Sequence, residues 1–230
     1  MKKVCSLIIA TLILVAFVAI LLPSVSAEPP VRLMIIEHWH RGERATANTI
    51  LEEDNSMENP DFKLLPFHWF VTAEFWINPS NRYGFSASAV VATITASADT
   101  WDSKTSATVF SYQGTTSRSA GKRDYYNVVA WGRYRAGVIA VTYIWYSGLQ
   151  ILETDTLMNN LYKWSLSGEA GKMDVQNIMT HEFGHWCGLD DLYEDKDYWL
   201  TMYGYASYGE TYKRTLGLGD ILGLQAVYRP

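Results

Sequence analysis

The residues most able to do chemistry lie in one short stretch, HEFGHWCGLDD, at positions 181–191. His181 and His185 are four residues apart, so on a helix they share one face with their β-carbons about 5–6 Å apart. Two such imidazoles can bind one metal ion, and zinc accepts their nitrogens at about 2.0–2.1 Å. Glu182 lies about 100° around the helix, where it can face a water molecule held by the metal. The pattern predicts a catalytic zinc site with Glu182 as general base.

Two histidines do not complete a catalytic zinc site, which usually has three protein ligands and one open position. Gly188 follows the helical run, and a glycine there allows the chain to turn sharply and return to the metal. Asp190 and Asp191 come just beyond this turn. Either carboxylate could therefore be the third ligand.

The stretch resembles the extended zinc motif HExxHxxGxxH/D of the metzincin metallopeptidases. Four positions match it, namely His181, Glu182, His185 and Gly188. Asp191 stands at the eleventh position, which is aspartate in the snapalysin-like variant. HEFGHWCGLDD is also similar to the matrixin-type HEFGHALGLGH. The resemblance selects Asp191 as the metal ligand and leaves Asp190 as a solvated or supporting carboxylate.

Three further segments resemble the matrixins. ILETDTLMN (151–159) is similar to the strand before the active-site helix, LTMYGYA (200–206) to the Met-turn, and GLGDILGLQAVY (217–228) to the C-terminal helix, DDIxGIQxLY. The resemblance implies an α/β (α+β) fold of the zincin type: a twisted five-stranded mixed sheet with an active-site helix and a C-terminal helix. It also implies a secreted zinc metalloendopeptidase, with Met202 forming a floor beneath the zinc.

Two matrixin features are missing. No cysteine lies between Cys5 and Cys187, so the cysteine switch of the pro-segment is absent, and the structural-zinc histidines are absent too. An aspartate ligand also adds negative charge, so we expect a somewhat weaker Lewis acid than with three histidines.

The elements that must position the motif follow from periodicity. Period-two alternation and β-branched or aromatic residues predict strands at 71–77, 107–112, 125–131, 138–146 and 149–158. Helical spacing predicts helices over 86–101, 174–187 and about 219–228. This order is typical of a mixed sheet covered by helices.

The 230 residues correspond to one domain or at most two. Residues 1–27 have the layout of a signal peptide, although their uncharged run of 19 residues (4–22) leaves an uncleaved membrane anchor as the alternative. Residues 28–65 are interpreted as an N-terminal extension, either a short pro-segment or a strand plus a loop. Residues 66–230 are interpreted as the metallopeptidase catalytic domain.

Charge and composition limit the partners. Lys and Arg number 19 against 24 Asp and Glu, a net charge of −5 with no basic block, which argues against nucleic-acid binding. We expect a monomer that acts on a protein or peptide substrate and meets a membrane only if residues 1–27 stay attached. Two rivals remain: a non-catalytic zinc-binding surface module of the same fold, and an aromatic-rich adhesion or carbohydrate-binding domain in which HEFGH is an ordinary helix.

Several other residues invite a role. Cys187 would point away from the metal on a helix, so we interpret it as a buried hydrophobe. His38 and His40 would share one face of a strand and could cap the zinc in an inactive precursor, but surface histidines are the preferred interpretation. His68, among aromatic residues, is interpreted as a packed histidine.

Two groups of polar residues complete the candidates. Any of three tyrosines after the Met-turn could hydrogen-bond an oxyanion or line the substrate pocket, namely Tyr203, Tyr205 and Tyr208. Glu153 and Asp155 are the candidates for a Ca²⁺ site, although no loop of the EF-hand type is present.

Overall fold

The computed structural model describes residues 29–42 and 56–229. The predicted signal peptide or anchor at 1–27 lies outside these residues. Within the two described segments, no helix combines the length and the apolar character needed to span a bilayer.

A seven-stranded mixed sheet forms the centre of the molecule, in the order β3-β2-β4-β6-β5-β1-β9. Its strands are β1 (Arg32–His40), β2 (Ala73–Ile77), β3 (Phe110–Thr115), β4 (Asn127–Gly132), β5 (Val138–Ser147), β6 (Gln150–Asn159) and β9 (Tyr205–Ala206). Strands β3, β2, β4 and β6 run parallel to one another, whereas β5 runs antiparallel to both β6 and β1. A separate parallel pair joins β7 (Trp164–Ser165) and β8 (Met173–Asp174).

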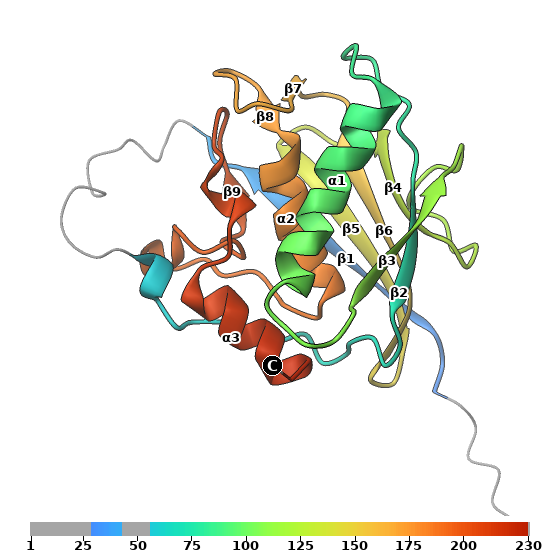
Figure 1. Ribbon diagram of the computed structural model, residues 1–230, viewed down its shortest axis with the longest axis vertical. Coiled ribbons are helices and arrows are strands. Elements are labelled where there is room, and N and C mark those ends of the chain that lie inside the picture. The colour runs from blue at the N-terminus through green and yellow to red at the C-terminus, as the bar shows by residue number, and fades with distance from the viewer. Residues whose placement is uncertain (1–28, 43–55, 230) are drawn as a thin grey trace, which may run out of the picture.

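Helices α1 (Ala87–Asp102) and α2 (Val175–Trp186) pack side by side on one face of this sheet, as Figure 1 shows. Helix α3 (Leu218–Val227) lies beside the lower end of α2 in the same view. Short 3₁₀ turns occur at η1 (Ser56–Glu58), η2 (Asp195–Asp197) and η3 (Tyr212–Arg214). The three predicted helices are confirmed to within one residue at each end.

The predicted number of five strands is wrong for the described sheet, which has seven. The five predicted strands are present as the contiguous group from β3 to β5, with boundaries shifted by up to three residues. The two additional strands, β1 and β9, extend the sheet beyond β5. Strand β1 comes from within 28–65, so this region contributes to the same sheet as the predicted catalytic domain.

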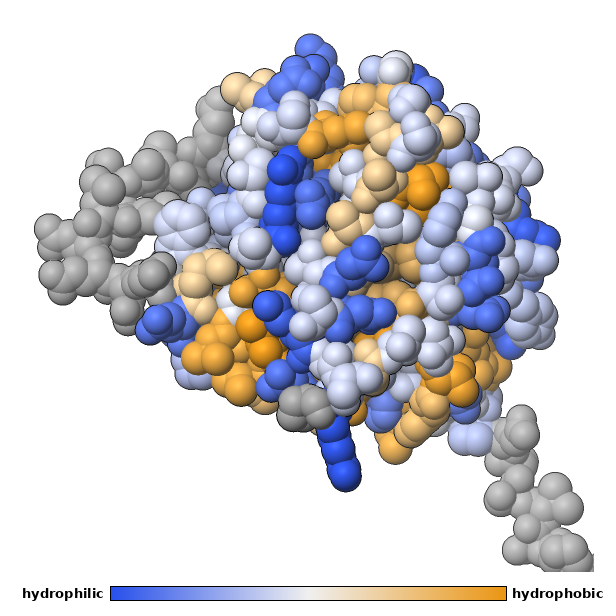
Figure 2. Space-filling view, in the orientation of Figure 1, coloured by the Kyte–Doolittle hydropathy of each residue, from blue (hydrophilic) through white to orange (hydrophobic). Residues whose placement is uncertain are grey.

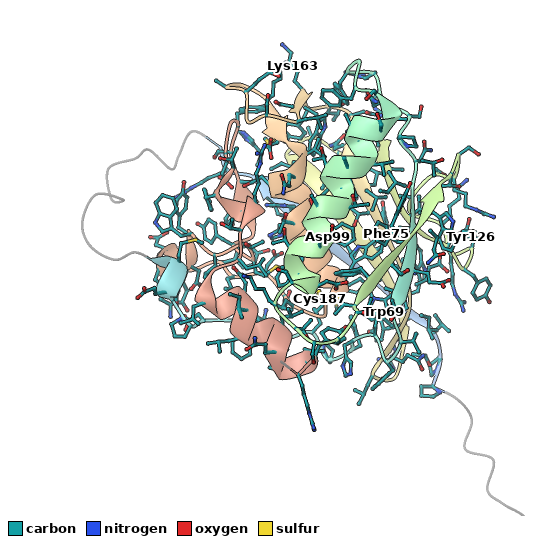
Figure 3. The ribbon with its side chains drawn as sticks, in the orientation of Figure 1. Trp69, Phe75, Asp99, Tyr126, Lys163 and Cys187 are labelled. Atoms are coloured by element: carbon teal, nitrogen blue, oxygen red, sulfur yellow. The ribbon has the colours of Figure 1, made fainter. Side chains whose placement is uncertain are left out.

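The sheet and helices are joined by a layer of aromatic side chains. Phe75 of β2, labelled in Figure 3, lies between β3 and the helices. Its ring centroid lies 5.3 and 6.2 Å from those of Phe183 and Trp186 of α2, and Phe110 joins the same cluster. The polar end of the Trp186 indole has a partner, since Nε1 donates to Thr156 Oγ1 at 2.9 Å. These contacts hold α2 rigidly over the sheet, which is a requirement for a precise site.

Apolar side chains also reach the surface. On the face seen in Figure 2 they gather over α3, where Leu218 and Leu222 are partly exposed.

Gly184, which directly precedes His185, lies where Met202 and Trp101 pack against α2. A β-carbon added there would lie 2.1 Å from Met202 Sδ and 2.8 Å from the Trp101 indole. We therefore predict that Gly184→Ala lowers the free energy of unfolding by about 1–3 kcal/mol, as overpacking does. Urea denaturation of the metal-free protein measures it. Gly42→Ala is the control because no atom lies within 4 Å of its added β-carbon; equal stabilities of the two variants would contradict the prediction.

Candidate metal centre

Helix α2 carries the motif and is fixed at its N-terminus. Asp174 caps the helix by accepting a hydrogen bond from Asn177 N at 2.9 Å. Arg214 of η3 also binds both oxygens of the Asp174 carboxylate. A capped and paired N-terminus fixes the helix, and so the direction in which its histidines point.

Gly188 ends α2 and turns the chain back. It adopts φ +90°, in the left-handed region that glycine enters without a steric penalty. A β-carbon at this position would also approach Phe67 O at 3.0 Å. Because of this turn, Leu189 O accepts a hydrogen bond from His185 Nδ1 at 2.9 Å, and Asp191 comes to lie beside both histidines.

Three predicted ligand atoms meet at one point. His181 Nε2 and His185 Nε2 are 3.1 Å apart, and Asp191 Oδ1 is 3.2 Å from the first and 3.6 Å from the second. All three side chains are buried. Four-coordinate zinc with ligands at about 2.0–2.1 Å requires donor atoms about 3.3 Å apart, so the set fits such an ion. This buried group could hold a metal ion.

The positions of the ring protons on His181 and His185 also favour a metal ion between the two rings. His181 Nδ1 lies 2.7 Å from Thr201 O, and His185 Nδ1 faces Leu189 O. A carbonyl oxygen only accepts, so each Nδ1 carries the proton and each neutral ring has a bare Nε2. Burial lowers the pKa of His181 to about 4, which favours the neutral ring. Two bare nitrogens facing each other repel unless a cation lies between them.

Asp191 is held as a ligand would be. Its Oδ2 accepts a hydrogen bond from the Tyr193 hydroxyl at 2.9 Å, while Oδ1 has no hydrogen-bond partner among the described residues. Burial acts to raise the pKa of Asp191, but the neighbouring histidines outweigh it and the pKa is lowered. Asp190 pairs with Lys63 through Oδ2 at 2.6 Å, while its Oδ1 accepts a hydrogen bond from Asp191 N at 2.9 Å. The structure thus brings Asp191, and not Asp190, to the two histidines.

Met202 packs against Gly184 of α2, the residue before His185. Its turn is fixed by Asp220 of α3, whose carboxylate accepts hydrogen bonds from Thr201 N at 2.8 Å and Met202 N at 3.0 Å. The same turn presents Thr201 O to His181. Asp220 of helix α3 therefore helps to orient the His181 ring through Thr201.

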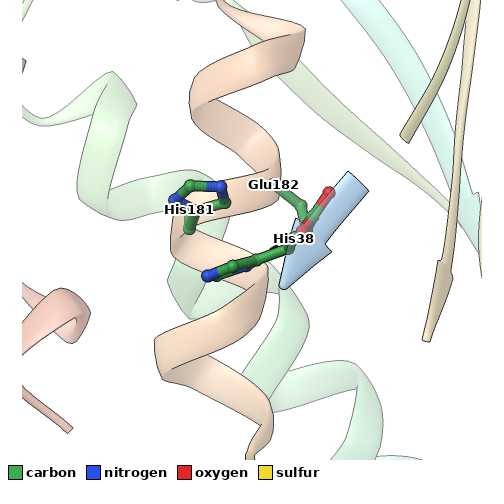
Figure 4. A group of neighbouring side chains, drawn as sticks. All are labelled: His38, His181 and Glu182. Atoms are coloured by element: carbon green, nitrogen blue, oxygen red, sulfur yellow. Dashed lines mark hydrogen bonds and ion pairs between the residues drawn. The ribbon is translucent and has the colours of Figure 1, made fainter. Parts of the chain in front are cut away.

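Glu182 is fully buried, and both of its oxygens are occupied. Thr142 of β5 donates to Oε2 at 2.6 Å, and His38 Nδ1 lies 3.2 Å from Oε1 (Figure 4). Burial raises the pKa of Glu182 to about 7. A carboxyl group with this pKa exchanges a proton readily near neutral pH, as a general base must.

The interpretation of His38 as a surface histidine is wrong. Its side chain is completely buried, and its ring stacks on that of His181 with centroids 3.7 Å apart, as Figure 4 shows. Burial, followed by the nearby His181, holds its pKa well below the usual value. The only sequence signal for this contact was the shared strand face of His38 and His40.

Sequence reasoning also missed Lys213. This lysine is fully buried, donates to Tyr203 O and Tyr205 O, and lies 3.4 Å from His38 Nε2. Burial lowers its pKa. Nothing in the sequence around η3 distinguishes this lysine from a solvated one.

The remaining candidates lie apart from the ligands. Cys187 is a buried free thiol at the end of α2, as predicted, and burial raises its pKa well above the usual value. His68 packs beside Phe70 and Tyr228, also as predicted. His40 is partly exposed between Tyr162 and Tyr208.

Glu153 and Asp155, the candidates for a Ca²⁺ site, hold a loop by hydrogen bonds to its backbone. Glu153 accepts hydrogen bonds from the backbone of Asp124 and Tyr125, and Asp155 from Gly121, Lys122 and Val128. Their oxygens therefore fix the loop before β4 and are not directed at a cation. Burial raises the pKa of Asp155 to about 7.

Comparison with known proteins adds no assignment. No family model matches the chain, and no curated protein matches it significantly. The candidate centre therefore has to be judged on its own geometry.

The paired aspartates provide a test of the ligand set. Loss of a residue that supports a metal ligand typically lowers metal affinity by about 10–100-fold. We predict that Asp191→Ala, which removes a ligand itself, lowers zinc affinity by more than this. Asp190→Ala is the matched control and should retain one zinc per chain, because its carboxylate faces Lys63. Metal analysis after dialysis against a chelator of known affinity measures both. Equal zinc retention by the two variants would contradict the assignment.

Tyr193 tests whether the third ligand is oriented. Tyr193→Phe removes the hydroxyl that binds Asp191 Oδ2 and leaves the half-exposed ring in place. We expect zinc affinity to fall by about tenfold, in the range found for residues that support a ligand. Competition with a fluorescent chelator measures it, and Tyr208→Phe, also about half exposed, serves as control. An affinity unchanged by Tyr193→Phe would show that Asp191 needs no such support.

Proposed function

We propose that this chain is a zinc-dependent endopeptidase of the metzincin type. The observation that supports it best is the meeting of two bare imidazole nitrogens and one unpartnered carboxylate oxygen from His181, His185 and Asp191. Zinc bound there supplies a Lewis acid that polarises a scissile carbonyl and makes a water molecule more acidic.

The protein's own residues have distinct tasks in this reaction. The carbonyls of Thr201 and Leu189 hold the two rings so that each Nε2 faces the metal. Glu182 has a carboxylate oxygen within 4.8 Å of a His181 ring nitrogen. It is placed to take a proton from the attacking water and to pass it to the leaving amine. Thr142 keeps the other carboxylate oxygen in position.

The wider structure supports the metzincin proposal in three places. An α-helix carries HEFGH, a glycine turn delivers the aspartate, and a methionine turn lies against the helix between the two histidines. The antiparallel strand β5 lies next to Glu182 through Thr142, and an extended peptide would pair with the edge of β5 that β1 occupies in this structure. Such an edge suits protein or peptide substrates.

We also propose that the protein is exported and acts as a monomer. The layout of residues 1–27 supports export, and the acidic composition argues against nucleic acid as a partner. Membrane attachment follows only if residues 1–27 are retained. The non-catalytic rival is weaker because Glu182 is intact and positioned. The adhesion rival predicts that the folded chain binds no zinc.

Replacing Glu182 tests the mechanism. We predict that Glu182→Gln retains zinc and fold but lowers kcat by about 10²–10⁴-fold, because the amide cannot accept the proton. Hydrolysis of unfolded casein by the zinc-loaded protein measures it, both before and after the chain is cut between residues 42 and 56.

The control for this variant is Glu169→Gln, since Glu169 is exposed and paired with Lys172. Wild-type hydrolysis rates in Glu182→Gln would exclude the proposed role of Glu182. A zinc-loaded wild-type chain that cleaves nothing before or after the cut would support the non-catalytic rival.

A further inference from the structure

The candidate centre is closed in this structure. His181, His185 and Glu182 are 0% exposed and Asp191 is 4% exposed. Peptide hydrolysis needs an open position on the metal and room for an extended substrate beside it. A described part of the chain therefore occupies the space that a substrate would need.

Strand β1 is the part that covers the centre. From β1, His38 stacks on His181 at 3.7 Å and binds Glu182 Oε1 through Nδ1. Lys213 Nζ lies 3.4 Å from His38 Nε2 and can donate only, so the His38 proton is on Nδ1, facing Glu182. His38 thus shields one ligand ring and occupies the general base at the same time.

The path of β1 is that of a bound peptide. It runs antiparallel along β5 with paired residues from Arg32, opposite Tyr146, to Trp39, opposite Val138. Apart from β1, the only neighbour of β5 in the sheet is β6. Without β1, the hydrogen-bonding groups of β5 would form a free sheet edge next to the metal centre, which is where extended peptides add.

Strand β1 is attached less firmly than an interior strand. Only Ile36 and His38 of its nine residues are buried, whereas Leu33 and Ile35 remain nearly half exposed. On its other side, β9 pairs with Trp39 and His40 alone. Besides its backbone hydrogen bonds, β1 is held through Glu37, which binds Tyr134 and Arg135. These contacts lie outside the aromatic layer under α2, so β1 can leave the sheet without opening that layer.

We propose that β1 is an autoinhibitory strand: it occupies the peptide-binding edge of β5 and closes the metal centre through His38, and the enzyme becomes active when β1 leaves. This inference rests on the proposed peptidase function and adds its regulation. In this proposal His38 covers the metal centre in place of a cysteine switch, because the chain has no cysteine between Cys5 and Cys187.

A reversible lock on β1 tests the proposal in the full chain. Ile35 lies directly opposite Tyr143, and residues opposite each other in antiparallel strands have Cα atoms about 4.5–5.5 Å apart. This separation suits a disulfide. We would prepare the Ile35→Cys/Tyr143→Cys variant with a recognition sequence for a site-specific protease inserted between Gly42 and Ser56. After the cut, only the disulfide keeps β1 covalently attached.

The first measurement is the rate at which a chelator removes zinc from the cut protein, oxidised or reduced with a phosphine. If the open form is about 0.1–10% populated while β1 is attached, the chelator reaches the zinc in only that fraction of the molecules. Reduction of the disulfide should therefore speed zinc removal by about tenfold or more. Equal rates would overturn the inference. The single Ile35→Cys variant is the control, and its rate should not change with reductant.

The second measurement is casein hydrolysis by the same samples. We expect activity in the reduced, cut form and none in the oxidised form. If the oxidised form cleaves casein as fast as the reduced form, β1 does not inhibit although the peptidase function holds. If reduction speeds zinc removal but no peptide is cleaved, β1 is a cover and the proposed peptidase function fails.

A pair of point variants tests His38 itself in the uncut chain. His38→Ala should raise both the zinc-removal rate and the basal hydrolysis, because Glu182 loses its partner on β1. His40→Ala is the matched control on the same strand, since His40 contacts only Tyr162 and Tyr208 among aromatic rings. Circular dichroism checks that both variants fold. Identical zinc-removal rates in the two variants would overturn the role of His38.

Discussion

The candidate centre depends on the direction of two imidazole lone pairs. Hydrogen bonds from Nδ1 of His181 to Thr201 O and from Nδ1 of His185 to Leu189 O fix both rings, so that the two Nε2 atoms face each other. These carbonyls belong to turns, one after Gly188 and one held by Asp220. The ligand geometry therefore requires the whole path from α2 to α3, and a cation between the nitrogens removes their repulsion.

Most of the buried polar groups around the candidate centre have hydrogen-bond partners. Glu182 has Thr142 and His38 as partners, and Lys213 donates to two backbone carbonyls. Uncompensated burial of charged groups costs several kcal/mol each, so such pairing is needed for the fold to be stable. Among the three candidate ligands, Asp191 Oδ1 has no hydrogen-bond partner in the described part of the chain. This unsatisfied oxygen is the atom that a metal ion would bind.

Strand β5 connects the chemistry with its proposed regulation. Thr142 of β5 binds Glu182, while the edge of β5 that faces away from β6 pairs with β1. A peptide that replaced β1 would therefore lie beside the proposed general base and the candidate metal ligands at once. Under this proposal, substrate binding and inhibition would be alternative uses of one set of backbone hydrogen bonds.

The amino-acid sequence by itself predicted the parts of the centre that depend on local geometry. His181, Glu182 and His185 lie on one helix, where the spacing of residues determines which side chains meet, and the helices and central strands follow from periodicity in the same way. Asp191 needed more than spacing, because Asp190 was equally close in the chain; the left-handed turn at Gly188 separates them.

Only the tertiary structure decided the rest. The contact between His38 and Glu182 spans 144 residues of sequence, and that between Lys213 and His38 spans 175. Such contacts depend on which strands pair and in what register. A strand within 28–65 was one of the two alternatives from the sequence, but no local pattern indicated that β1 and β9 join the sheet beside β5. The use of Glu153 and Asp155 to hold a loop likewise depends on the path of a distant segment. Local periodicity carries no information on these long-range choices, because they follow from the packing of the whole sheet.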